Sequence, residues 1–188
     1  MIETFCSKWG SESIIALQEI PLWDGKQLNF ATHKLFSQPS HDTGFLVPNQ
    51  LMPYVRDISF GYYWNAVLFQ GFTVISAHLN WDELAAPELG EEFTCRADRS
   101  CQEINEHLAA LRGKHPEWWC ALCVDANVTI PSFEHKLVGK AVYRKQEASF
   151  PWSGRVDDRR QFCRLLASAD LAAANTFETV APADAWTY

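Results

Sequence analysis

Three short apolar runs of this chain are each followed closely by an acid or an imidazole. The pairs are residues 13–17 with Glu19, residues 72–77 with His78, and residues 118–124 with Asp125. Buried strands that deliver polar groups at their ends are the means by which an α/β sheet builds a site at one rim. We therefore expect the three strands to bring these groups to one rim, in a set suited to a divalent cation and a phosphate.

The composition is that of one ordinary globular domain. The chain has 188 residues, 47% hydrophobic and 21% charged, and is long enough to bury a core. No apolar run reaches the length of a membrane span, and residues 1–5 lack the features of a secretory signal, so we expect no membrane contact and an intracellular location.

The net charge of −7 argues against a nonspecific nucleic-acid coat protein, but not against an enzyme that docks one phosphodiester.

Two of the six cysteines form the motif Cys120-x-x-Cys123. The motif invites a zinc or redox interpretation, but it lies inside an apolar run, and no second Cys/His pair follows at zinc-finger spacing. In a strand, residues three positions apart point to opposite faces. We therefore predict free thiols, with neither bound zinc nor a mutual disulfide.

Local patterns predict a mixture of helices and strands. Gln70-Gly71 stands between two apolar runs and predicts a two-residue hairpin turn, with Gly where a positive φ is needed. Cys101, Ile104, Leu108 and Leu111 share one face of a helix that ends at Gly113. The strand at 118–124 is expected to be central and buried. The expected elements are helices at 2–9, 94–113 and 157–166, strands at 13–18, 44–47, 65–69, 72–79, 118–124 and 171–174, and one short strand within 27–40.

Four short motifs stand in a familiar order and spacing along the chain. They are Leu17-Gln18-Glu19, Ser76-Ala77-His78-Leu79, Val124-Asp125-Ala126-Asn127 and Ala174-Asn175-Thr176. With them, the chain resembles the endonuclease/exonuclease/phosphatase superfamily of DNase I-like enzymes. It is most similar to the endonuclease domains of non-LTR retrotransposons, whose Thr-Trp segment after the Asn-Thr strand resembles Asp184-Ala185-Trp186-Thr187.

The resemblance implies a four-layer α/β sandwich, in which two packed mixed β-sheets are flanked by helices. Residues 1–188 would form a single domain of this kind, but only part of it. Family members begin with an earlier strand that carries an Asn, and they end with an Asp-bearing strand and a Ser-Asp-His segment. Neither is found in this sequence, so we expect the fold to be incomplete at both termini.

The resemblance also assigns roles to individual residues. Glu19 would bind Mg²⁺ or Mn²⁺, and Asp125 would orient or deprotonate the attacking water. Asn127 would donate a hydrogen bond to the phosphoryl oxygen, because in an extended segment residues two apart face the same phosphate. His78 would act in acid/base chemistry or contact a phosphate, and Asn175 would bind the substrate. The structural alternatives are a solvated strand-end Glu19 and an Asx turn at Asp125.

Three functions follow from these observations. The first is a DNA endonuclease of retroelement origin, part of a polyprotein with a reverse transcriptase and weakly active or inactive as this chain alone. The second is a phosphatase or phosphodiesterase that acts on a small phosphorylated substrate. The third is a non-catalytic remnant or binding module. The aromatic run Tyr62-Tyr63-Trp64 is expected to cover a sheet face in preference to stacking on nucleobases.

Overall fold

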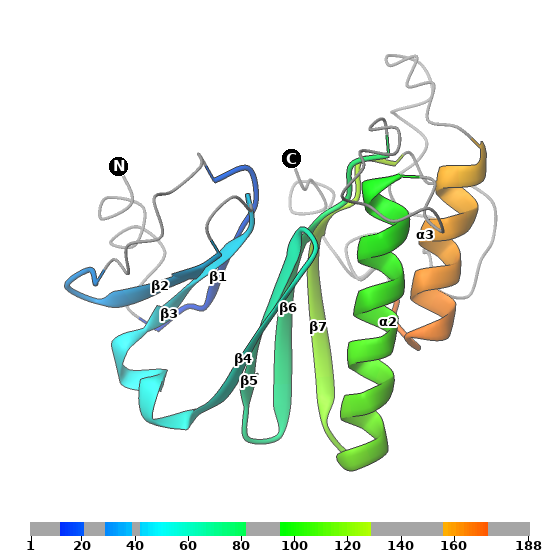
Figure 1. The fold of residues 1–188 in the computed structure, drawn as a ribbon. Coiled ribbons are helices and arrows are strands. Elements are labelled where there is room, and N and C mark those ends of the chain that lie inside the picture. The colour runs from blue at the N-terminus through cyan, green and yellow to red at the C-terminus, as the bar shows by residue number, and fades with distance from the viewer. Residues whose placement is uncertain (1–11, 21–28, 39–41, 82–94, 129–155, 173–188) are drawn as a thin grey trace, which may run out of the picture.

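The chain forms two β-sheets and a layer of helices (Figure 1). The structure, a computed structural model, describes residues 12–20, 29–38, 42–81, 95–128 and 156–172. Within these ranges the elements are β1 (Ile15–Leu17), β2 (His33–Ser37), β3 (Gly44–Pro48), the 3₁₀ helix η1 (Asn49–Tyr54), β4 (Val55–Gly61), β5 (Trp64–Phe69), β6 (Phe72–His78), α2 (Arg96–Lys114), β7 (Trp119–Asp125) and α3 (Val156–Ser168).

The two sheets differ in their strand pairing. The first has the order β1-β3-β2 and is antiparallel throughout. The second has the order β4-β5-β6-β7, in which only the pairing of β6 with β7 is parallel. The fold is therefore α/β, with one antiparallel and one mixed sheet. The helix expected at 2–9, which would form a fourth layer, and the Asn175 segment lie outside the described residues.

The predicted hairpin is confirmed. β5 and β6 pair from Trp64↔Ala77 down to Phe69↔Phe72, and Gly71 in the turn has φ 92°. This region of backbone space is open to Gly because it has no Cβ. The hairpin sends β6 back along the sheet, so that His78 stands at its carboxyl end.

The space between the two sheets is filled by an apolar cluster. Strand residues alternate between faces, and one face of each sheet contributes to this cluster. Phe45 and Val47 enter it from β3, and Val67 and Phe69 enter it from β5. All four are buried. The opposite face of β5, which carries Trp64, packs toward the helices.

Helices α2 and α3 cover the outer face of the second sheet (Figure 1). As predicted, Ile104 and Leu108 of α2 are buried, and so are Leu165 and Leu166 of α3. The last turn of α2 carries Arg112 and Lys114, whose charges suit the negative end of the helix dipole.

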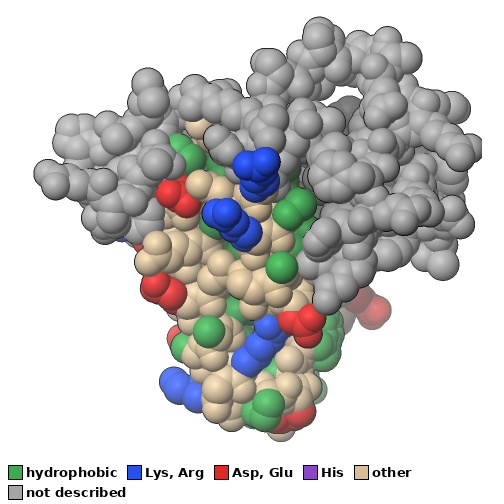
Figure 2. All heavy atoms as spheres, turned by 90° about the vertical axis from the view of Figure 1, so that its right-hand side faces the viewer, with side chains coloured by type: hydrophobic (Ala, Val, Ile, Leu, Met, Phe, Trp, Pro, Cys, Tyr) green, Lys and Arg blue, Asp and Glu red, His purple; other side chains and the backbone are tan. Residues whose placement is uncertain are grey.

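The exposed side of the molecule that carries the helices shows scattered charge. In Figure 2, basic and acidic side chains of the described residues are interspersed with polar and apolar ones.

No helix in the described ranges combines the length and the apolar character needed to cross a bilayer.

Two expectations about strands were wrong. The strand at 119–125 is the last of the described second sheet, and its residues are half-buried or exposed instead of central and buried. β1 is also only half-buried and spans three residues. Leu171 and Ala172 are in no strand, and the rest of the strand expected at 171–174 lies outside the described residues. β4 was missed, because Arg56 and Asp57 interrupt its apolar alternation next to an irregularity in its pairing.

We predict that Leu108→Ala lowers the free energy of unfolding by about 2–5 kcal/mol, because the truncation leaves a cavity in a fully buried part of the helix–sheet core. Urea denaturation measures the change. Leu111→Ala on the same helix is the matched control, since Leu111 is only half-buried. Equal losses in the two variants would show that α2 does not pack as described.

Candidate functional site

The parallel pairing of β6 with β7 brings two of the candidate residues side by side. His78 and Asp125 are register partners at the carboxyl ends of these strands. His78 is two and four residues beyond Ser76 and Val74, so it points to the same face as they do. Val74 packs in the cluster between the sheets. The candidate site therefore lies at one end of the inter-sheet layer.

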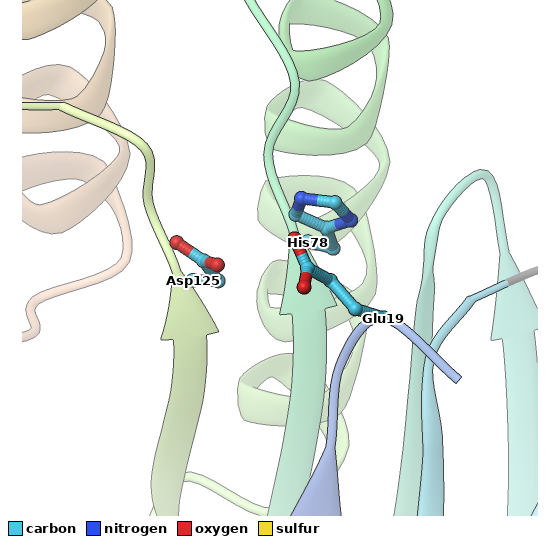
Figure 3. Close-up of side chains that lie close together, drawn as sticks. All are labelled: Glu19, His78 and Asp125. Carbon is cyan, nitrogen blue, oxygen red and sulfur yellow. The ribbon is translucent and has the colours of Figure 1, made fainter. Parts of the chain in front are cut away.

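Glu19 reaches the same place from the first sheet. It follows β1 by two positions and has φ 54°, in the left-handed region. Glu19, His78 and Asp125 each offer one ligand atom, and these atoms all lie within 4.8 Å of one another. Figure 3 shows the three side chains turned toward a shared space beyond the strand ends. Glu19 is exposed, and the other two are half-buried.

A polar bridge ties the two sheets together directly below these residues. Gln18 Nε2 donates to Ser76 Oγ at 3.0 Å and to the carbonyl of Cys123 at 3.2 Å. Ser76 Oγ in turn donates to the carbonyl of Leu17 at 3.0 Å. Each of Gln18, Ser76 and Cys123 precedes one candidate residue by one or two positions. The bridge therefore sets how far Glu19 stands from His78 and Asp125.

His78 is held by a carboxylate that sequence analysis did not single out. Its Nδ1 lies 2.5 Å from Asp42 Oδ2. Asp42 lies two residues before the first residue of β3, and β3 runs antiparallel to β1. The start of β3 therefore lies at the same end of the sheet as the end of β1, which is why Asp42 arrives beside the site. Asp42 could be found only from this antiparallel pairing, because no local motif in the sequence marks it.

The carboxylates around His78 favour its charged form. The pKa of His78 is raised above its usual value, mainly by the hydrogen bond to Asp42. Burial acts in the opposite direction, while the negative charges of Asp42, Asp125 and Glu19 add to the rise. The ring nitrogen bound to Asp42 is fixed in place, and the other nitrogen remains for chemistry at the site.

Asn127 does not have the conformation that was expected. Its φ of 46° takes it out of extended geometry, so the prediction that Asp125 and Asn127 project in parallel from one extended segment is wrong. Its backbone N–H approaches Asp125 Oδ1 at 3.3 Å, as in an Asx turn, and its Nδ2 donates to the carbonyl of Leu79 at 3.2 Å. These contacts tie the ends of β6 and β7 together.

The structure thus gathers Glu19, His78 and Asp125 and places Asn127 beside them. Asn175, the remaining candidate, lies outside the described residues, as does the segment from Asp184 to Thr187. The sequence pattern that predicted this group correctly was an apolar run followed by a polar residue.

The cysteine pair and the aromatic run serve packing in the described structure. Cys120 packs in the helix–sheet core, whereas Cys123 lies on the other side of β7, and both thiols are free. Burial raises the pKa of the Cys120 thiol to about 11. Trp64 is buried against the helices. The ring of Tyr63 lies under the guanidinium of Arg96, at 4.8 Å from its centroid.

The chemistry of the site matches a hard divalent cation. Two carboxylates from different sheets are the ligands that Mg²⁺ and Mn²⁺ prefer, together with water and phosphate oxygens. The imidazole beside them, held by Asp42, adds either a ligand or a hydrogen-bond donor. The donor set therefore fits both the metal and a phosphate.

No protein-family model matches the chain, and no curated protein matches it.

We predict that Ser76→Ala lowers the free energy of unfolding by about 1–3 kcal/mol, because it removes the buried hydroxyl that joins Gln18 to Leu17. Chemical denaturation measures the loss. Ser59→Ala, on β4 at the far edge of the same sheet, is the matched control and should change stability less. A Ser76→Ala protein as stable as the wild type would mean that the bridge does not join the sheets.

A second prediction concerns pH. A His whose pKa is raised on folding stabilises the folded state fully below its unfolded pKa of about 6.5, and this stabilisation is lost as pH rises through the folded pKa. Asp42→Asn should remove most of it. The stability difference between wild type and Asp42→Asn should therefore be largest near pH 6 and shrink toward pH 9. Denaturation in EDTA across this range, with His78 followed by NMR, tests it; a difference that grows with pH would contradict the pairing.

Proposed function

We propose that this chain is a Mg²⁺- or Mn²⁺-dependent phosphodiester hydrolase that acts on DNA. The observation that carries the proposal is the convergence of Glu19, His78 and Asp125 at one end of the inter-sheet layer, with ligand atoms within 4.8 Å. Three strands from two sheets must meet for this to happen. The hydrolytic chemistry is proposed from this group of side chains, and DNA as substrate from the resemblance of the four motifs to DNase I-like nucleases.

Glu19 and Asp125 are the residues that would hold the cation. The exposure of Glu19 leaves it open to solvent and substrate, and the bridge through Gln18 holds its backbone close to β6 and β7. When bound, the cation supplies Lewis-acid polarisation of a phosphate oxygen. Without it, two carboxylates facing each other would repel a phosphate.

The protein side chains carry the proton transfers. Asp125 also accepts the proton of the attacking water, since its carboxylate stands at the carboxyl end of β7, beside the space that it shares with Glu19 and His78 (Figure 3). Asp42 favours the protonated form of His78, and in that form the other ring nitrogen donates to a phosphate oxygen or to the leaving group. Asn127 uses one amide hydrogen on the Leu79 carbonyl and has a second for a phosphoryl oxygen.

Plasmid relaxation in MgCl₂ or MnCl₂ tests the proposal. Glu19→Ala and Asp125→Ala should each lower nicking by about 10²-fold or more, because they remove groups that act in the transition state. Glu106→Ala, an exposed acid on α2, is the matched control and should nick as the wild type does. EDTA should abolish nicking.

Two outcomes would overturn parts of this proposal. Nicking that survives EDTA, or that Glu19→Ala and Asp125→Ala leave intact, would remove the metal mechanism. Hydrolysis of p-nitrophenyl phosphate or of bis-p-nitrophenyl phosphate without nicking of DNA would instead assign a small phosphorylated substrate to the same residues.

A further inference from the structure

Four buried side-chain oxygens near the candidate site lack a hydrogen-bond donor. All four belong to described residues and lie at the end of the inter-sheet layer that carries His78: Gln38 Oε1, Asp42 Oδ1, Thr43 Oγ1 and Asn65 Oδ1. Thr43 and Asn65 are each only 1% exposed. Buried polar atoms in folded proteins nearly always have a partner. A cluster of acceptors without one therefore calls for donors from a bound molecule.

The strand register places these oxygens together. Ser37 pairs with Gly44 at the end of β2 and β3, so Gln38 and Thr43 face each other one step beyond. They lie on the face that carries Phe36 and Phe45, because strand residues alternate. That face belongs to the inter-sheet cluster.

Asn65 joins the group from the second sheet. It lies on the inter-sheet face of β5, and its Nδ2 donates to the carbonyl of Phe36 at 3.4 Å. It is the register partner of Ser76, two residues before His78. Asp42 completes the group, since its other oxygen is bound to His78. The register and these hydrogen bonds thus place the four groups at the end of the layer that carries His78.

The chemistry of the group favours water over a metal ion. Three of the four oxygens are neutral, and the one carboxylate already serves His78. A divalent cation takes six or more oxygens and is usually held by at least one carboxylate that is free to bind it. A buried water donates two hydrogen bonds and commonly makes about three with groups of this kind. The Thr43 hydroxyl can donate as well as accept, so one or two waters complete the hydrogen bonds of the four groups.

We propose that ordered water molecules are bound between the sheets by Gln38, Thr43, Asn65 and Asp42, and that they lock the Asp42 carboxylate against His78. Thr43 and Asn65 are then positioning residues, which act on His78 through water and Asp42. The water site stands apart from the proposed hydrolase activity, whereas any effect of Thr43 on catalysis rests on that function.

Oxygen-17 magnetic relaxation dispersion on the metal-free protein counts internal waters of long residence and tests the site without substrate. Thr43→Val and Asn65→Leu should each lose at least one such water, and Thr43→Ser should retain it. The matched control is Thr73→Val, since Thr73 is equally buried but its hydroxyl already donates to the carbonyl of Val67 at 3.3 Å; it should leave the count unchanged.

The positioning role has its own readout. In Thr43→Val, the ¹⁵N resonances of the His78 ring should move toward those of a ring without the Asp42 hydrogen bond, and in Thr43→Ser they should return. An unchanged water count in both Thr43→Val and Asn65→Leu would overturn the water site. Anomalous density between the sheets in crystals soaked in MnCl₂ would show that these oxygens bind a cation and not water. Unchanged His78 resonances in Thr43→Val would overturn the positioning role. Failure of DNA nicking alone would leave both results standing and would count only against the hydrolase.

Discussion

The bridge from Gln18 to Ser76 and Cys123 is the interaction on which the site depends. Parallel pairing alone places His78 next to Asp125, but it cannot bring Glu19 from the other sheet. Hydrogen bonds from the half-buried Gln18 amide and the buried Ser76 hydroxyl do this with defined geometry, whereas apolar contact between the sheets would allow them to slide. The separation of the candidate groups therefore follows from this bridge.

The layer between the sheets changes character along its length. At the end far from the site, Phe69, Phe72 and Trp119 stack in sequence, with centroids 4.6 and 4.7 Å apart. At the other end the same face carries Ser76 and His78. Apolar packing at one end supplies stability, and this lets the other end hold polar groups that stabilise the fold less but form the candidate site.

Charge at the site is unbalanced without a positive partner. Glu19, Asp42 and Asp125 act on one imidazole and raise its pKa. Even a protonated His78 leaves an excess of negative charge, which a bound cation would offset. This excess supports both the proposed metal and the assignment of His78 as a charged donor. It also explains why a phosphate would need the cation in order to approach.

Local patterns in the sequence determined the β5–β6 hairpin, the buried faces of α2 and α3, and the strand ends that carry Glu19, His78 and Asp125, because turn residues and periodicity act over a few positions. The tertiary structure alone decided the partner of His78 and the place of β7 at the end of the described second sheet. The turn at Asn127 is local and matches the Asx alternative at Asp125. Asp42 is 36 residues from His78, and only the antiparallel pairing of β1 with β3 brings it there. Such contacts depend on register between distant strands, which no local pattern encodes.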